Sequence, residues 1–322
     1  MFHFRILPPW QPPDVAVDLG TATTRIAFAH RSMTVETPSV CGFTPALRAG
    51  VVVDADVAGE VLRPAIARLR RMGILLPRAL ACAPSDTTPE ERTAVRESCY
   101  RAGAGAVALM PEPLAAAIGA GLDLIEDRPI LLMDIGEGVT DCALIRSGRI
   151  RCSNAVRVAC ADLHEKLRVF FRARYGVVVS SADARKITEE VGVASPFPEQ
   201  GGLPLLRFRT VRGTHPYTGQ FLEVDIPVGL IREELQPLVR RISETAVTLI
   251  EDLTAPDRYA VHQQGIHLTG GGSLLPNMAA QVNAATGCPV VPVKNPLVAV
   301  VSGAKRVLPV VSESDLWRPH PR

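Results

Sequence analysis

The chain repeats one short pattern, in which an apolar strand ends in an aspartate and a glycine-containing turn leads into a second strand. The two copies are VDLGTATTRIAF at residues 17–28 and MDIGEGVTDCAL at residues 133–144. When they are superposed, Asp18 aligns with Asp134 and Gly20 with Gly136. Each copy has the pattern of a β-hairpin with an acid at the end of its first strand. A duplication of this kind restricts the chain to folds with two similar halves.

A second repeat follows in the same order along the chain. The segment PLAAAI at residues 113–118 resembles PLVAVV at residues 296–301, and each follows a short apolar strand. Apolar strands also alternate with helical segments in both parts of the chain, which is typical of a mostly parallel sheet covered by helices. We therefore expect an α/β fold of two duplicated halves around a cleft, at residues 14–128 and 129–308.

The second half carries extra material that has no counterpart in the first. Residues from about 180 to 255 combine helical spacing with an alternating strand segment, and they predict a lid subdomain. In the first half only the short segment 41–50 stands at the matching place, so a matching lid is nearly absent. Residues 1–13 and 309–322 are assigned as tails, and the proline-rich residues 8–13 and the polar residues 312–322 are expected to be loose.

Composition narrows the class of protein. The net charge of +2 on 322 residues gives no electrostatic basis for binding nucleic acid. The seven cysteines are scattered and include no Cys-x-x-Cys pair, which indicates reduced thiols. No apolar run reaches the roughly 20 residues of a membrane span, and the apolar stretch at the N-terminus is too short for a signal peptide. These features predict a folded cytoplasmic protein.

The glycine-containing turns have the composition of phosphate-binding loops, because facing turns can present backbone amides to phosphate oxygens. The candidate residues are Gly20, Thr21, Ala22 and Thr23 in the first turn, and Gly136, Glu137, Gly138, Val139 and Thr140 in the second. A third cluster, made of Gly270, Gly271, Gly272, Ser273 and Leu274, stands between a strand and a helix and offers amides at a helix N-terminus. Asp18 and Asp134 are placed to hold a hydrated Mg²⁺ against the phosphates.

Glu112 stands directly before Pro113 at the expected start of a helix. Two roles fit this position. The acid is either a solvated residue favoured by the helix dipole, or a carboxylate that orients the water attacking a γ-phosphate. The sequence contains neither a Walker-type phosphate loop nor a Gly-x-Gly-x-x-Gly fingerprint, so the predicted phosphate site is of another type.

These motifs resemble the actin and heat-shock chaperone ATPase superfamily, and most closely its MreB family of bacterial actins. The resemblance covers residues 14–308 and rests on the segments 18–24, 112–121, 134–140 and 269–275. It implies two RNase H-like halves that bind ATP or ADP with Mg²⁺, and a weak ATPase that serves as an assembly switch. It assigns catalytic roles to Glu112, Asp134 and Thr140, and adenosine contacts to Arg185, Lys186, Ile187, Thr188 and Glu190.

The resemblance further implies self-assembly into filaments and a role in cell-shape or cell-wall morphogenesis, with cell-wall elongation proteins and the inner membrane surface as partners. The chain departs from the MreB pattern at Thr23, Glu137, Thr188 and Cys160-Ala161. It also has the short segment 41–50 where MreB proteins carry the subdomain called IB. That gap favours an alternative, a non-polymerising nucleotide-dependent adaptor or scaffold. A small-molecule kinase is a third candidate, but no further cluster of acids and arginines suits an acceptor.

The N-terminal segment carries several large apolar side chains beside Arg5, namely Phe2, Phe4, Ile6, Leu7 and Trp10. An apolar tip of this kind either inserts at a membrane interface or packs on its own domain. The sequence leaves both possibilities open.

Overall fold

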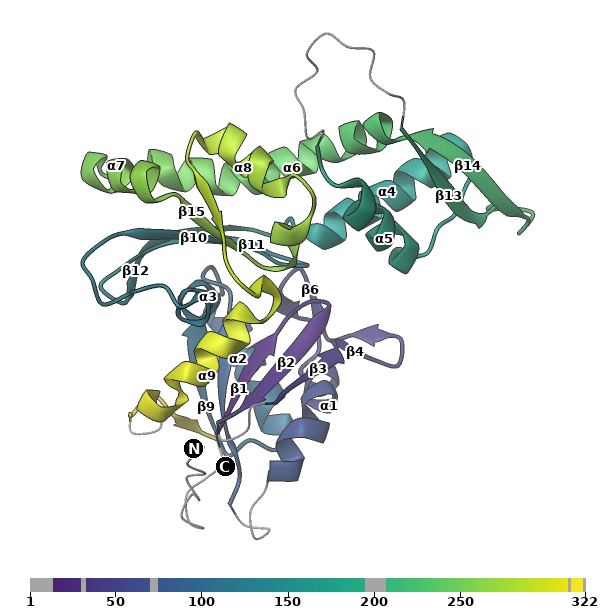
Figure 1. The fold of residues 1–322 in the computed structure, drawn as a ribbon. Helices are drawn as coiled ribbons and strands as arrows, with labels where there is room; N and C mark the ends of the chain where they lie inside the picture. Colours follow the sequence, from purple (N-terminus) through teal and green to yellow (C-terminus); the bar gives the residue numbers. More distant parts are fainter. Residues whose placement is uncertain (1–13, 30–32, 70–74, 195–206, 312–313, 321–322) are drawn as a thin grey trace, which may run out of the picture.

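The computed structural model describes residues 14–29, 33–69, 75–194, 207–311 and 314–320. Within these ranges the chain forms two α/β halves, each built on one mixed sheet (Figure 1). The N-terminal tail predicted at residues 1–13 lies outside the described residues. Among the described helices, none is both long enough and apolar enough to cross a bilayer.

The first half is built on a sheet with the strand order β17-β9-β8-β1-β2-β3. Its strands are β1 (Asp14–Leu19), β2 (Thr23–Phe28), β3 (Thr34–Pro38), β8 (Arg78–Ala83), β9 (Ala106–Pro111) and β17 (Arg318–Pro319). β1, β8 and β9 are parallel, whereas β2 and β3 continue from β1 as antiparallel neighbours. Every residue of the central strand β1 is buried, which fits a strand covered on both faces.

The second half repeats this arrangement in a sheet with the order β12-β11-β10-β15-β16. Its strands are β10 (Ile130–Ile135), β11 (Thr140–Arg146), β12 (Arg149–Val156), β15 (Ile266–Thr269) and β16 (Val290–Pro292). β10, β15 and β16 are parallel, and β11 and β12 are antiparallel neighbours of β10. The duplicated hairpin predicted from the sequence is therefore confirmed as β1–β2 and β10–β11.

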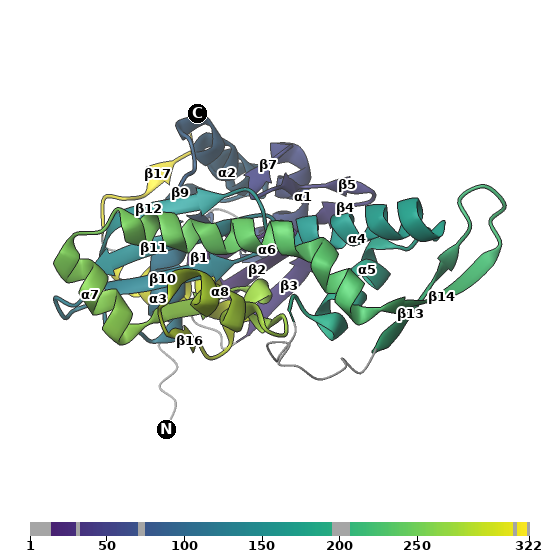
Figure 2. The ribbon, with the colours of Figure 1, turned by 90° about the horizontal axis from the view of Figure 1, so that it is seen from above.

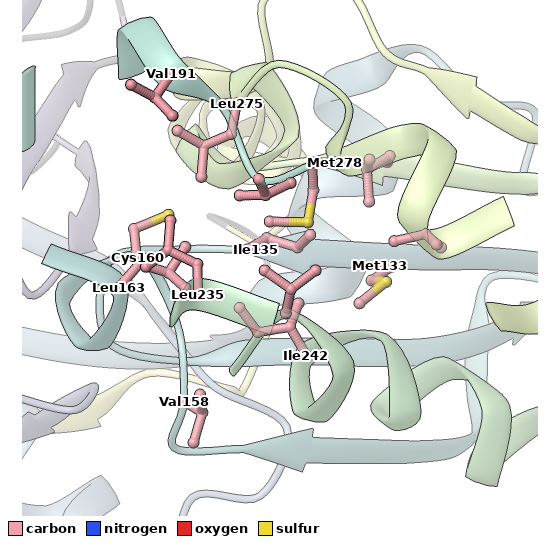
Figure 3. Packing of buried hydrophobic residues seen from close by; sticks show 14 of the residues in the cluster. Met133, Ile135, Val158, Cys160, Leu163, Val191, Leu235, Ile242, Leu275 and Met278 are labelled. Carbon is pink, nitrogen blue, oxygen red and sulfur yellow. The ribbon is translucent and has the colours of Figure 1, made fainter. Parts of the chain in front are cut away.

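Helices cover the outer faces of both sheets. The first sheet packs against α1 (Ala55–Ile66) and α2 (Pro89–Arg101), and the short 3₁₀ helix η1 (Ala67–Leu69) follows α1. The second sheet packs against α6 (Val228–Glu251) and α8 (Met278–Thr286), with α7 (Ala255–Gln264) beyond α6. Seen from above, α6 lies along the second sheet (Figure 2). Figure 3 shows Met133 and Ile135 of β10 packed with Ile242 of α6 and Met278 of α8.

Two helices lie between the sheets, α3 (Glu112–Ala120) and α9 (Ala299–Val311), and α9 is preceded by the 3₁₀ helix η3 (Pro296–Val298) (Figure 1). They form a third core that includes residues of both sheets. α9 falls in the range predicted for the second half, yet it packs on β1, β2 and β8 of the first sheet. α3 in turn contacts β10 and β11 of the second sheet. The last helix of each half therefore packs against the sheet of the other half.

The crossing of α3 and α9 depends on two glycines. A Cβ at Gly119 would overlap the carbonyl oxygen of Ala299, and a Cβ at Gly303 would overlap that of Ala115. Close approach of two helix backbones requires residues without a side chain at the point of contact. The two helices are thus in direct backbone contact at the centre of the molecule.

The lid material of the second half comprises α4 (Cys160–Tyr175), α5 (Ser181–Val191) and the hairpin β13 (Phe208–Thr214) with β14 (Phe221–Pro227). α6 reaches beyond the lid, since Asn154 of β12 donates to the carbonyl of Thr245. Between β3 and α1 the first half has two small hairpins. They are formed by β4 (Val40–Cys41), β5 (Thr44–Pro45), β6 (Leu47–Arg48) and β7 (Val51–Val52).

The expectation of a loose segment at 312–322 is wrong for its described residues, and the tail boundary predicted at 309 falls inside a helix. α9 continues to Val311, and β17 pairs with β9. The indole nitrogen of Trp317 donates to the carbonyl of Val311, and the guanidinium of Arg78 lies over the Trp317 ring. An aromatic ring that finds both an apolar face and a cation holds the segment against the sheet.

Candidate functional site

The two repeated turns face each other across one cleft. It is lined by Asp18 to Thr23 from the first turn, by Asp134 and residues 136–139 from the second, and by Gly270 and Gly271 from the third cluster. The turns meet closely, because a Cβ at Gly138 would overlap the hydroxyl of Thr21. Strand ends position both turns, since β1 ends at Leu19 and β10 at Ile135. The duplication thus places two equivalent acidic turns on opposite walls of the cleft.

Most of the residues singled out in the sequence line this cleft. They are Asp18, Gly20, Thr21, Ala22, Thr23, Glu112, Asp134, Gly136, Glu137, Gly138, Val139, Arg185, Gly270 and Gly271. Glu112 begins α3 and is partly buried, so of its two predicted surroundings the structure shows a cleft wall rather than a solvated surface.

Other predicted site residues lie outside the lining. Ile187 and Thr188 are buried on the inner face of α5, where the Thr188 hydroxyl donates to the carbonyl of Ala184. Lys186 and Glu190 are on the outer part of α5, and Glu190 pairs with Arg209. The fully buried Thr140 hydroxyl donates to the carbonyl of Val158.

The third glycine cluster is only half in the cleft. It continues into a 3₁₀ helix, η2 (Gly271–Leu274), and α8 begins later at Met278, so no α-helix N-terminus stands at the glycines. Gly272 is buried against Ile135 and Cys160, the Ser273 hydroxyl donates to the carbonyl of Gly270, and Leu274 is exposed. The expectation of helix-terminal amides at this cluster is therefore wrong, because the chain makes a tight 3₁₀ turn first.

Four carboxylates converge on the floor of the cleft. Burial raises the pKa of Asp134 to about 7, with Asp18 and Asp141 adding to the rise. Burial also raises the pKa of Asp18 to about 6, against the opposing charge of Arg25. Burial and then Asp18 raise the pKa of Glu112 well above its usual value. Buried acids that repel one another favour any cation that enters between them.

Asp134 gives the strongest indication of a cation-binding site. Its buried Oδ1 atom has no hydrogen-bond partner among the described residues. Carboxylate oxygens are hard ligands that suit Mg²⁺. Within the described ranges, no three acids, histidines or cysteines lie close enough to hold one ion directly. The residues therefore fit a hydrated Mg²⁺ that would keep most of its waters, and Asp18 and Asp134 are the residues that would hold it.

Glu137 stands in the second turn with two basic partners. Its carboxylate accepts a hydrogen bond of 2.6 Å from Arg185 of α5 and lies 3.4 Å from Nδ1 of His164 in α4. Burial alone would raise the pKa of Glu137, but the bond from His164 and the charge of Arg185 outweigh it and hold the pKa below its usual value. The turn thus carries an ionised acid whose charge is balanced from the lid.

Residues that sequence reasoning missed join the two halves at the cleft. Asp141 accepts hydrogen bonds of 2.7 and 2.6 Å from the backbone amide and the hydroxyl of Ser85. Arg157 donates to Asp86, to Glu91 and to the carbonyl of Ala49. Asp141 directly follows the second motif, and this position could have identified it as a site residue from the sequence. Arg157 has no such signal, because its partners come from distant segments.

Comparison with known proteins places this architecture in a family. A family model described as MreB/Mbl protein matches residues 43–315. The cell shape-determining protein MreB of Escherichia coli (strain K12) is 30% identical, and the match covers 92% of this chain and 94% of that protein. The cell shape-determining protein Mbl of Bacillus subtilis (strain 168) is 27% identical, and the match covers 90% of this chain and 94% of that protein.

Solved structures agree in fold. MreB5 of Spiroplasma citri bound to AMPPNP superposes with a TM-score of 0.82 at 24% identity, and covers 94% of this chain and 97% of its own. MamK in a double helical filament superposes with a TM-score of 0.74 at 18% identity, and covers 93% of this chain and 99% of its own. The actin-like fold expected from the motifs is thereby confirmed. The sequence matches and the shared fold together establish that this chain belongs to the MreB/Mbl family.

Proposed function

We propose that this protein is a cytoskeletal ATP-binding protein whose nucleotide state controls its assembly in cell-shape or cell-wall morphogenesis. One observation carries the proposal, namely that the duplicated acidic turns meet in one cleft around the unpartnered Oδ1 of Asp134. Facing glycine-containing turns suit phosphate oxygens, and the carboxylates suit the cation that accompanies them. The relatives bear names of cell shape-determining proteins, and one solved relative carries AMPPNP.

The chain's own residues divide the work in the cleft. The amides of the two turns bind the phosphates. The third glycine cluster and Arg185 line the part of the cleft that binds the adenosine. Asp18 and Asp134 would hold a hydrated Mg²⁺, which would neutralise negative charge on the phosphates of the nucleotide. Glu112 sits at the start of α3 on the floor of the cleft and orients water toward the γ-phosphate. Thr140 holds its turn to the carbonyl of Val158.

Self-assembly is supported by exposed apolar side chains on the lid hairpin. Tyr217 lies in the turn between β13 and β14, and Phe208 and Phe221 lie on the strands, all three exposed. Exposed aromatic residues on one small element are typical of a protein interface. MamK, a relative in fold, is found in a double helical filament. Cell-wall elongation proteins and the inner membrane surface are further partners that we propose on the family relationship.

The alternative, a nucleotide-dependent adaptor that does not polymerise, is favoured by the segment between β3 and α1. Two hairpins with strands of two residues each occupy this place in the first half. So small an element offers little area to a neighbouring subunit, whereas a stable interface buries about 800 Å² per partner.

One experiment separates the two functions. Nucleotide binding is measured first by titration of a fluorescent ATP analogue with and without Mg²⁺, and assembly is then followed by sedimentation and electron microscopy in ATP, ADP or no nucleotide. We expect polymer in ATP, its loss in Asp18→Ala, and in Glu112→Gln a fall in hydrolysis of about a hundredfold or more with binding kept. Binding without polymer at any concentration would establish the adaptor, and absence of binding would overturn both.

A further inference from the structure

A second cavity lies on the first half, away from the nucleotide cleft. It has a volume of about 540 Å³ and is enclosed by β2, β3, α1 and η1. We call it the apolar groove, and its apolar wall is formed by Ile26, Phe28, Met33, Val35, Val61 and Leu69. Met33 is 54% exposed although it belongs to this wall. A large apolar side chain that is exposed at the mouth of a cavity, as Met33 is, indicates that another apolar group covers it.

The segment that precedes β1 begins beside this groove. Asp14 opens β1, and its carbonyl oxygen accepts a hydrogen bond from the amide of Ala29. The next residue, Val15, lies opposite Phe28 of the groove wall in the sheet register. Asp14, to which the segment is attached, therefore lies one or two strand spacings, roughly 5 to 10 Å, from the groove. Thirteen extended residues reach about 40 Å, so the tether is long enough.

The chemistry of that segment matches the groove. Phe2, Phe4 and Ile6 occupy alternate positions, which places them on one side of an extended chain, with His3 and Arg5 on the other. The lining also includes the exposed Glu36 on β3, whose carboxylate pairs with Arg25 at 3.2 Å and can share its charge with a second cation such as Arg5. A tethered segment meets its own site at an effective concentration in the millimolar range. Arg68, the other charged group of the lining, would keep its guanidinium toward solvent.

We propose that the N-terminal segment, residues 1–13, folds back into the apolar groove of its own chain and places Phe2, Phe4 and Ile6 against it. While docked, the segment is shielded from lipid and from other subunits. When released, it becomes an apolar tip that another surface can bind. The groove is then a holding site that controls when the tip is offered.

The chain supplies its own probe, since Trp10 and Trp317 are its two tryptophans. In a Trp317→Phe background, the emission of Trp10 reports whether the segment is buried, and acrylamide quenching measures its access to solvent. The conservative change keeps an aromatic ring beside Arg78. We expect Trp10 emission to be blue-shifted, and its quenching constant to lie well below that of a synthetic peptide of residues 1–13, at every protein concentration.

Two further variants test the groove itself. Met33→Glu places a charge in the groove at an exposed position, and Phe4→Ser removes an apolar side chain from the segment without touching the folded part. Both are expected to shift the emission to the red and to raise quenching to the value of the free peptide. Ile125→Glu is the matched control, because it adds the same charge at a site that is 93% exposed outside the groove lining, and is expected to leave quenching unchanged.

The other occupants give different results. Protection that grows with protein concentration would show docking on a second copy. Exposed Trp10 that becomes protected only with vesicles of phosphatidylglycerol and phosphatidylethanolamine would show insertion into the bilayer. Protection that survives both Met33→Glu and Phe4→Ser would show docking elsewhere on the chain. Each of these results would overturn the proposal.

Discussion

The guanidinium of Arg185 donates to the carboxylate of Glu137 at 2.6 Å, inside the turn whose amides line the nucleotide cleft. An acid at this place repels phosphate, and the pairing uses up a cation that would otherwise attract it. The lid helix α5 and the second turn are therefore linked through a charge pair that a bound nucleotide must share. In the function that we propose, this pair couples the side of the cleft that binds adenosine to the side that binds phosphate.

Replacing Glu137 by Gln removes the negative charge and releases Arg185 toward the phosphates. We expect nucleotide to bind roughly tenfold more tightly, a gain of about 1.4 kcal/mol. Titration of a fluorescent ATP analogue measures the change. Arg185→Gln serves as the opposite variant and is expected to weaken binding, since it leaves the Glu137 charge with His164 alone. Weaker binding by Glu137→Gln would show that the carboxylate contacts the ligand or its cation favourably.

Because the acids of the cleft are buried, we expect the stability of the folded protein to fall as the pH rises. The pKa of Asp134 is about 7 in the folded protein against 3.8 ordinarily, so the folded state holds a proton that the unfolded state releases between these values. Stability in the absence of nucleotide and metal therefore falls as pH rises from about 4 to about 7. We expect a lower Tm at about pH 8 than at about pH 5.

Asp134→Asn should reduce that loss by at least about 1.4 kcal/mol, the equivalent of one pKa unit. The fall that remains reflects Asp18 and Asp141, whose pKa values burial raises to about 6, and Glu112, whose pKa burial raises well above its usual value. Thermal melts of the unchanged protein and of Asp134→Asn are recorded across pH, with and without Mg²⁺. Addition of Mg²⁺ is expected to raise the Tm most at high pH. Glu244→Gln on the exposed side of α6 is the control. A Tm that rises with pH would contradict the prediction.

The helix crossing at the centre of the molecule is expected to tolerate no side chain. Gly303→Ala would place a methyl group on the carbonyl of Ala115, and we expect a loss of about 3 kcal/mol of unfolding free energy. Gly229→Ala is the matched control, because it lies in α6 with open space around it and should stabilise the helix slightly. Urea unfolding measures both, and equal stability of the two variants would show that the helices shift apart at little cost.

The contacts of Arg157 hold the two halves together beside the cleft. Arg157→Gln breaks its bonds to Asp86 and Glu91, and we expect ATP to bind roughly tenfold more weakly because the closed state must be reformed. X-ray scattering of the nucleotide-free protein should give a larger radius of gyration. Arg212→Gln removes an ion pair of similar length from the exposed lid hairpin, and should change neither quantity. An unchanged radius and affinity for Arg157→Gln would place the control of closure elsewhere.

The duplication is what made the fold predictable. Two copies of a hairpin with an acid at the same place specified both sheets, and local patterns were enough for β1, β2, β10 and β11. The same logic brought Asp18 and Asp134 to one cleft. Helix α5 shows the limit of this reasoning. The local pattern predicts the helix, but it does not predict which face of the helix is turned toward the cleft. Thr188 and Ile187 face the core, whereas Arg185 reaches the cleft.

Other features depend on partners that are remote in sequence. Arg157 meets Ala49, Asp86 and Glu91 only after both halves have formed. The C-terminal segment is polar and proline-containing, yet the hydroxyl of Tyr100 donates to the carbonyl of Arg318 more than two hundred residues away. A local pattern carries no information about such a contact, and for this reason the segment was expected to be loose.

The exchange of last helices between the halves bears on how the protein is made. During synthesis from the N-terminus, the face of the first sheet that carries Ala16, Leu80 and Ala108 is finished long before α9 leaves the ribosome. α3 contacts β8 and β9, so it covers part of this face early, but the part that packs against α9 stays uncovered until nearly the whole chain has been translated. The first half therefore completes its core only with the last part of the chain, so a nascent chain stalled before α9 would expose apolar surface to chaperones and proteases.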